Sequence, residues 1–306
     1  MPRGRHLLSW VVGLAVLGLG AWLVLRSRAD IERAVADLGV GVLCLAALLG
    51  VLGTVLIAQV WLVLLRGLGV QAPRREIAAV FFVSQLGKYL PGSVWPVLAQ
   101  MELGHRWGAP RRTMLTANIM MLAVVAATGL TVGAALLPWS GGDGLSRYGW
   151  TLVLLVPLLA CLHPRTIPVA VDLALRAVGR EPLGIRVAGR SMLAALGWGL
   201  MVWAVMGLHL LVMTRALGAA PPAAAAAAAV GGMGLGWAAG LIFVPAPAGA
   251  GVRDAVLVAT LAPLLGAPEA LSVALASRVL LLLADVVLAG IGAALRPGRR
   301  SPRAQH

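Results

Sequence analysis

The sequence predicts an all-α integral membrane protein with about six transmembrane helices and two re-entrant or broken helical hairpins in an inverted repeat. Apolar residues make up 60% of the 306 residues, and the mean hydropathy is +0.93. Charged residues make up only 12%, whereas soluble proteins carry about 25%. A chain of this composition cannot cover itself with polar surface in water. We therefore expect a single polytopic membrane domain over residues 1–306.

Six apolar segments are long enough to be predicted as transmembrane helices. They are residues 7–25, 38–65, 113–137, 148–162, 192–214 and 269–295, of which 148–162 is the shortest. The first segment could be a signal peptide, but its 19 residues run directly into Arg26-Ser27-Arg28 with no cleavage site of small residues. We therefore expect an uncleaved helix there.

Two further apolar regions are interrupted by glycine and proline. Residues 77–98 contain Gly-Lys-Tyr-Leu-Pro-Gly-Ser at 87–93, and residues 223–265 contain Pro-Ala-Pro-Ala-Gly-Ala-Gly at 245–251. Proline removes a backbone donor, and clustered glycines favour non-helical backbone, so each helix should stop and restart. We expect two broken hairpins that return to their own side. The alternative is a pair of short full spans, or a proline-kinked helix, in each region.

The distribution of arginine predicts the orientation. With both hairpins re-entrant and the N-terminus in the cytoplasm, seventeen arginines fall in cytoplasmic segments and five fall outside. The outside residues are Arg26, Arg28, Arg33, Arg147 and Arg215. Cytoplasmic loops of membrane proteins are enriched in Lys and Arg. We therefore predict a multi-pass protein of the cytoplasmic membrane with both termini in the cytoplasm.

The broken hairpins divide the chain into two halves. Residues 1–137 hold the first hairpin, residues 163–190 form a cytoplasmic linker, and residues 191–295 hold the second hairpin. Residues 296–306 are a basic cytoplasmic tail. Two interrupted segments in corresponding positions, which enter from opposite faces, are typical of an inverted repeat with a central binding site.

The two interruptions resemble the signature motifs of the lysylphosphatidylglycerol synthase transmembrane-region family. The first resembles Gly-Lys-Tyr-Leu-Pro-Gly followed by a small residue, and the second resembles a Pro-rich, Gly-rich motif that ends in an acidic residue. Arg278 fits an arginine that this family carries on a later helix. Ala248 stands where the family has Gly, and Asp254 where it has Glu. Only Gln100 and Glu102 stand where the family often has an arginine.

The resemblance implies the lipid-translocating part of this family, which includes the flippase domain of the multiple peptide resistance factor. It implies a binding site for a lipid phosphate at the motif residues. These are Lys88, Tyr89, Pro91, Gly92, Ser93, Arg253 and Arg278. With no synthase domain in the sequence, lipid aminoacylation is not implied.

Ionisable residues inside apolar segments independently indicate the same region. Lys88 is the only lysine in the chain and adjoins a helix restart, whose free N–H groups favour a phosphate. The alternative is that Lys88 extends to the cytoplasmic head groups. Asp254 and Arg278 form the expected ion pair. Asp285 lies on the same helix face as Arg278 and needs another partner, and either carboxylate could couple transport to an ion.

We therefore expect a lipid transporter, flippase- or scramblase-like, rather than an enzyme. Its substrate would be a phospholipid or a polyprenyl-phosphate-linked sugar, and its partners would be membrane lipids, with no nucleic acid. Two cysteines and five scattered histidines show no metal-ligand spacing, so no metal or cofactor is expected. The alternatives are an intramembrane enzyme acting on lipid phosphates and a non-transporting helper of a membrane glycosyltransferase or synthase. A homo-oligomer or a synthase partner stays open.

Overall fold

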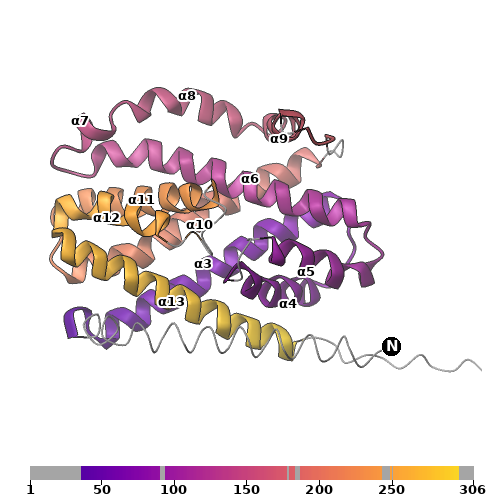
Figure 1. Cartoon of the computed structure of the whole chain (residues 1–306), viewed down its shortest axis with the longest axis horizontal. Coiled ribbons are helices and arrows are strands. Elements are labelled where there is room, and N and C mark those ends of the chain that lie inside the picture. Colours follow the sequence, from indigo (N-terminus) through magenta and orange to yellow (C-terminus); the bar gives the residue numbers. More distant parts are fainter. Residues whose placement is uncertain are drawn as a thin grey trace, which may run out of the picture.

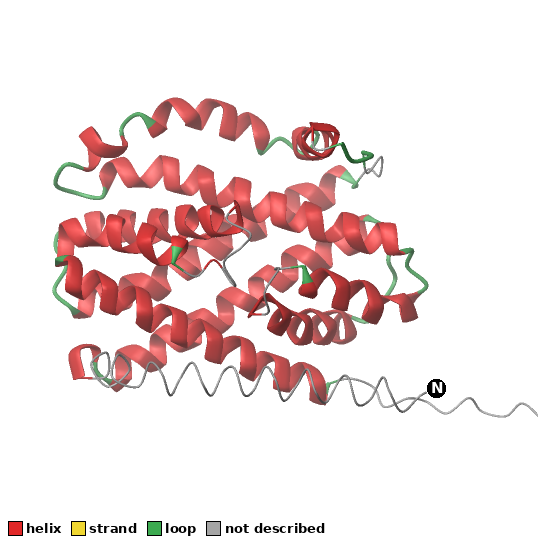
Figure 2. Cartoon of the chain, in the orientation of Figure 1, coloured by secondary structure: helices red, strands yellow, loops and turns green. Residues whose placement is uncertain are grey.

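The described part of the chain is a bundle of helices. The computed structural model describes residues 36–89, 94–177, 179–182, 187–242, 249 and 251–295. These residues contain helices and connecting turns but no strand (Figure 2). The predicted all-α class is confirmed. The predicted first span at 7–25, the motif residues Pro91, Gly92 and Ser93, and the tail at 296–306 lie outside the described residues.

The helices follow one another along the chain as labelled in Figure 1. Their bounds are α3 Val40–Gly67, α4 Arg74–Gln85, η1 Leu86–Tyr89, α5 Trp95–Gly104, η2 His105–Trp107, α6 Arg111–Leu136, η3 Leu137–Trp139, α7 Gly144–Tyr148, α8 Thr151–Cys161, α9 Thr166–Ala177, α10 Gly189–Ala216, α11 Pro222–Ile242, α12 Val252–Leu265 and α13 Ala267–Ala294, where η marks a 3₁₀ helix.

Five of the described helices are long and apolar enough to cross a membrane, namely α3, α6, α10, α11 and α13. Four of them confirm the spans predicted at 38–65, 113–137, 192–214 and 269–295. The fifth, α11, was predicted as one arm of the second hairpin, so that arm alone has the length of a span.

The span predicted at 148–162 corresponds to α8, which is not long enough to cross a membrane by itself. Helix α8 has 11 residues, or roughly 16 Å, which is much less than the apolar thickness of a bilayer, about 30 Å. The chain bends by 101° between α8 and α9. His163 and Pro164 lie at this bend, and the missing donor of the proline prevents the helix from continuing. Helices α8 and α9 together are a broken span or a re-entrant segment.

Each broken hairpin begins and ends at the same end of the bundle. In the first, Trp107 Nε1 after α5 donates to Glu76 Oε2 at the start of α4 (3.2 Å). In the second, a Cβ on Gly141 would contact Ala224 at the start of α11 and Leu264 at the end of α12. Helix α6 connects these two ends, so the hairpins enter from opposite ends, as Figure 1 shows.

The hairpins end in the interior of the bundle. Lys88, beside the end of α4, contacts Asp285, which lies about 14 Å from the C-terminus of α13 at 1.5 Å per residue. Asp254, at the start of α12, contacts Arg278, which lies about 17 Å from the N-terminus of α13. The described ends of both hairpins therefore meet α13 near the middle of its length.

The helix contacts repeat between the two halves. Helix α6 packs on α11, just as α13 packs on α4, and α3 packs on α10 at the centre. Suppose that α3, α4, α5 and α6 correspond in order to α10, α11, α12 and α13. The contact of α6 with α11 then corresponds to the contact of α13 with α4, and the contact of α3 with α10 corresponds to itself. This is the pattern expected of the predicted inverted repeat.

The two ends of the bundle differ in charge, which allows the predicted orientation to be tested. We expect Ser146→Cys, in the exposed α7, to react with an impermeant thiol reagent added outside intact cells. Gln71→Cys, exposed between α3 and α4 at the arginine-rich end, should react only after permeabilisation. Native Cys44 and Cys161 are first replaced by alanine. Labelling of Gln71→Cys but not Ser146→Cys in intact cells would invert the proposed topology.

Candidate functional site

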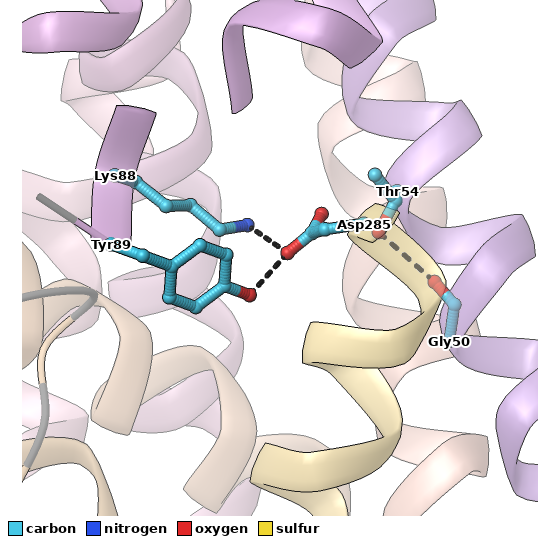
Figure 3. Close-up of polar contacts among 5 residues, drawn as sticks. All are labelled: Gly50, Thr54, Lys88, Tyr89 and Asp285. Carbon is cyan, nitrogen blue, oxygen red and sulfur yellow. Dashed lines mark hydrogen bonds and ion pairs between the residues drawn. The ribbon is translucent and has the colours of Figure 1, made fainter. Parts of the chain in front are cut away.

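Lys88 and Tyr89 both contact Asp285, across the junction between the first hairpin and α13 (Figure 3). Lys88 Nζ lies 2.7 Å from Asp285 Oδ2, and the Tyr89 hydroxyl donates to the same oxygen at 2.5 Å. The side chain of Asp285 is 1% exposed and that of Lys88 is 33% exposed. A buried carboxylate is strongly destabilising unless it is paired, and these two donors supply that pairing.

Asp254 and Arg278 form the corresponding contact with the second hairpin. An Arg278 Nη2 hydrogen donates to Asp254 Oδ2. The same oxygen accepts a hydrogen bond from the backbone N–H of Gly251 (3.0 Å), the residue that caps α12. Gly251 has φ +83°, which favours glycine, and Asp254 lies in the first turn, where the helix dipole stabilises a carboxylate. The predicted pair of Asp254 and Arg278 is confirmed.

Arg253 forms no ion pair with another of the described residues. Its Nη2 atom is buried and has no hydrogen-bond partner among the described residues. Its guanidinium interacts electrostatically with Tyr89, Asp254, Arg278 and Asp285. Arg253 adjoins Asp254 in the first turn of α12, so we group it with the two ion pairs and call Lys88, Tyr89, Arg253, Asp254, Arg278 and Asp285 the central cluster.

The central cluster has an excess of positive charge. Lys88, Arg253 and Arg278 are cations, whereas Asp254 and Asp285 are the two carboxylates. The ion pairs use Oδ2 of each carboxylate. The other oxygen, Oδ1, is buried in each case and has no hydrogen-bond partner in the described part of the chain. On α3, Thr54 donates to the carbonyl of Gly50 in its own helix (3.1 Å; Figure 3). With three cations and two carboxylates, the central cluster can neutralise one further negative charge.

Helix α13 holds both ion pairs at a fixed separation. Arg278 and Asp285 are seven residues apart, almost two turns, so they lie on one face and are about 10 Å apart along the axis. The first hairpin contributes Lys88, which pairs with Asp285, and the second contributes Asp254, which pairs with Arg278. The sequence predicted that these residues share a face, and the structure supplies the partner of Asp285, which is Lys88.

Glycines allow the two arms of each hairpin to approach closely. A Cβ on Gly87, next to Lys88, would lie 3.0 Å from Pro96 N at the start of α5. On α11, Gly232, Gly236 and Gly240 recur every four residues, and added Cβ atoms there would approach Thr260, Arg253 and Gly249 to 2.4–3.3 Å. Small residues at such spacing allow helices to pack tightly in a membrane. This packing holds Arg253 and Asp254 at the position described.

A family model described as lysylphosphatidylglycerol synthase TM region matches residues 10–289. The chain belongs to this family. The match covers both hairpins and every residue of the central cluster, and it confirms the resemblance predicted from the two motifs. No functionally curated protein matches the chain. Among the described residues, this family member has no group of three or more His, Cys, Asp or Glu side chains that could hold a metal ion.

Two buried polar contacts close to these helices were not predicted from the sequence. His209 on α10 contacts the Ala46 carbonyl through Nδ1 (2.7 Å) and Ser277 Oγ through Nε2 (3.0 Å). The carbonyl can only accept, so Nδ1 carries the proton and Nε2 accepts from Ser277. Gln100 on α5 donates to Ser84 on α4 (2.8 Å). Both contacts join residues far apart in the sequence, so no local pattern indicates them.

The pairing of Asp254 and Arg278 can be tested by a double-mutant cycle. Asp254→Asn should lower the free energy of unfolding by about 1–3 kcal/mol, because it leaves a partly buried cation without its carboxylate. Adding Arg278→Gln should recover part of that loss. The midpoint of unfolding in a denaturing detergent measures both effects. Arg278→Gln with Glu269→Gln, an exposed carboxylate on the same helix, is the control and should be additive. Additive losses for Asp254 and Arg278 would exclude the pairing.

Proposed function

We propose that this protein is a flippase- or scramblase-like transporter, and not an enzyme, that moves a phosphate-bearing lipid across the cytoplasmic membrane. The substrate would be a phospholipid or a polyprenyl-phosphate-linked sugar. The observation that carries the proposal is the excess positive charge of the central cluster, in which one guanidinium nitrogen of Arg253 has no hydrogen-bond partner among the described residues. Ionisable residues inside a membrane are strongly disfavoured unless they are paired, and they commonly mark a substrate pathway. A lipid phosphate is an anion that matches this excess.

The contacts of Lys88 support a role for Asp285 as its counter-ion between transport events. Lys88 is partly exposed, whereas Asp285 is buried, so of the two side chains Lys88 is the one that an external group can reach. A lipid phosphate would share or replace that contact, because it presents the same type of anionic oxygen acceptor. Tyr89 would stay on Asp285 and keep the carboxylate partly satisfied while Lys88 is engaged.

The arrangement of the hairpins supports alternating access. One hairpin enters from each end of the bundle, and each is held to α13 by one ion pair. Release of the Lys88 contact would free the first hairpin without disturbing the second, and release of the Arg278 contact would do the reverse. The head group would pass the central cluster while the acyl chains stay in the bilayer. Protonation of Asp254 or Asp285 would weaken one ion pair and is our proposed route for coupling to an ion gradient.

We also propose that both termini are cytoplasmic. The end of the bundle where the first hairpin enters carries Arg66, Arg74, Arg111, Arg112 and Arg190, whereas Arg147 and Arg215 lie at the opposite end. The positive-inside rule assigns the first of these ends to the cytoplasm.

The role of Lys88 can be tested by transport in liposomes of a fluorescent phospholipid with a phosphate head group. Lys88→Met alone would leave Asp285 buried with only Tyr89 as a donor, so we expect it to lower stability as well as transport. Lys88→Met combined with Asp285→Asn removes both charges and should fold. Loss of a charge-assisted contact of about 1.5–3 kcal/mol should slow transport by roughly tenfold to a hundredfold.

Two further variants complete this experiment. Lys88→Arg should keep partial activity, because the charge survives while the compact ammonium geometry does not. Arg111→Met removes a cation that is 70% exposed and lies outside the central cluster, so its transport rate should equal that of the wild type. If the folded double variant of Lys88 and Asp285 transports lipid at the wild-type rate, Lys88 is not part of the phosphate site.

A further inference from the structure

Three arginines line a cavity that shares no residue with the central cluster. The cavity has a volume of about 360 Å³ and lies between α3, α4 and α10. Arg66 comes from the last turn of α3, Arg74 from the start of α4 and Arg190 from the start of α10. The connection between α3 and α4 and the distant start of α10 thus bring positive charge to one place.

Among the residues that the structure describes, no carboxylate forms an ion pair with these arginines. Each of the three side chains is exposed, and none forms an ion pair with another residue in the described part of the chain. Arg66 at a helix C-terminus is favoured by the helix dipole, but Arg74 and Arg190 stand in first turns, where the dipole opposes a cation. The helix dipole therefore does not explain Arg74 and Arg190. The positive-inside rule accounts for arginines at this end of the bundle, and their position around one cavity also suits an external anion.

The cavity continues from the arginines along an apolar wall. On α3, Leu62 and Val63 follow Arg66 toward the middle of the helix, and Gln59 lies deepest, about 10 Å below Arg66. On α10, Trp198 lies eight residues beyond Arg190, or about 12 Å along the helix. Both helices are long and apolar enough to cross the membrane. The arginines therefore mark the level of the head groups, and the apolar wall extends toward the hydrocarbon.

We propose that this cavity binds an anionic phospholipid from the leaflet at that end of the bundle. The arginines would hold the phosphate and a second polar group of the head group, and Leu62, Val63 and Trp198 would pack against the first carbons of an acyl chain. Basic pockets between membrane helices are suited to anionic lipid head groups. The apolar wall selects a lipid over a free anion, since a free phosphate gains nothing from it. This site does not depend on the proposed transport activity.

Binding can be measured on the purified full chain by native mass spectrometry and thermal unfolding in detergent. The probes are phosphatidylglycerol, phosphatidylcholine and inorganic phosphate, each added separately. The wild type should retain phosphatidylglycerol and be stabilised by it. The triple variant Arg66→Gln, Arg74→Gln and Arg190→Gln should bind it at least about tenfold more weakly, because charge-assisted contacts are lost.

The matched control removes the same charge from the same end of the bundle. Arg165, Arg176 and Arg180 are exposed and do not line the cavity, so their triple glutamine variant should bind phosphatidylglycerol as the wild type does. If both triple variants lost the same affinity for phosphatidylglycerol, the loss would be due to overall charge rather than to the cavity, and the proposal would be overturned. Stabilisation by inorganic phosphate equal to that by phosphatidylglycerol would overturn the assignment to a lipid.

A second measurement covers the case in which the triple variant does not fold. Phosphatidylglycerol with brominated acyl chains, at a low fraction in phosphatidylcholine, should quench a component of the tryptophan fluorescence that Trp198→Phe lacks. Identical quenching of the wild type and Trp198→Phe would show that the lipid does not occupy the cavity.

Discussion

The high free-energy cost of an unpaired charge inside a membrane is the constraint on which the arrangement of this protein depends. Asp285 is almost completely buried, and its charge is compensated by Lys88 and Tyr89 from the first hairpin. Arg278 is compensated by Asp254 from the second. Both hairpins are interrupted by proline and glycine and cannot be held in place by continuous helix. The two ion pairs to α13 are therefore the directional contacts that fix where each hairpin ends.

Close backbone packing makes these contacts possible. In a bilayer, lipid chains are as apolar as leucine, so helices associate through van der Waals packing and hydrogen bonds. The glycines of α11 allow α12 to pack closely, so that Arg253 and Asp254 face α13. Gly87, next to Lys88, likewise allows the start of α5 to pack closely against the first arm of its hairpin. Small residues and ion pairs thus act together. The small residues determine the distance between neighbouring helices, and the ion pairs determine where along α13 each hairpin is held.

The central cluster and the arginine cavity present positive charge in two different ways. In the cluster, carboxylates partly neutralise the cations inside the bundle, which leaves one charge in excess. In the cavity, three exposed arginines surround the mouth of an apolar groove. Interaction with an anion should therefore be strong but limited by desolvation in the first site, and weaker in the second, where the arginines are exposed.

The sequence alone determined the features that depend on local composition. The apolar segments, the interruptions at 87–93 and 245–251, and the family followed from residues adjacent in the chain, because hydrophobic length and helix breaking are local properties. The pair of Asp254 and Arg278 could also be predicted, since both are charged residues isolated in apolar segments. The bend of 101° between α8 and α9 could not be read from hydropathy, because hydropathy does not report the direction of the chain.

Only the tertiary structure decided which charges meet and which polar groups are buried. Lys88 and Asp285 are separated by 197 positions, and no periodicity connects them. The contacts of His209 with Ser277 and of Gln100 with Ser84, and the convergence of Arg66, Arg74 and Arg190, likewise join residues from different helices. Such pairings depend on helix crossing, rotation and depth. Those are set by packing over the whole bundle, and a sequence pattern within one helix does not contain them.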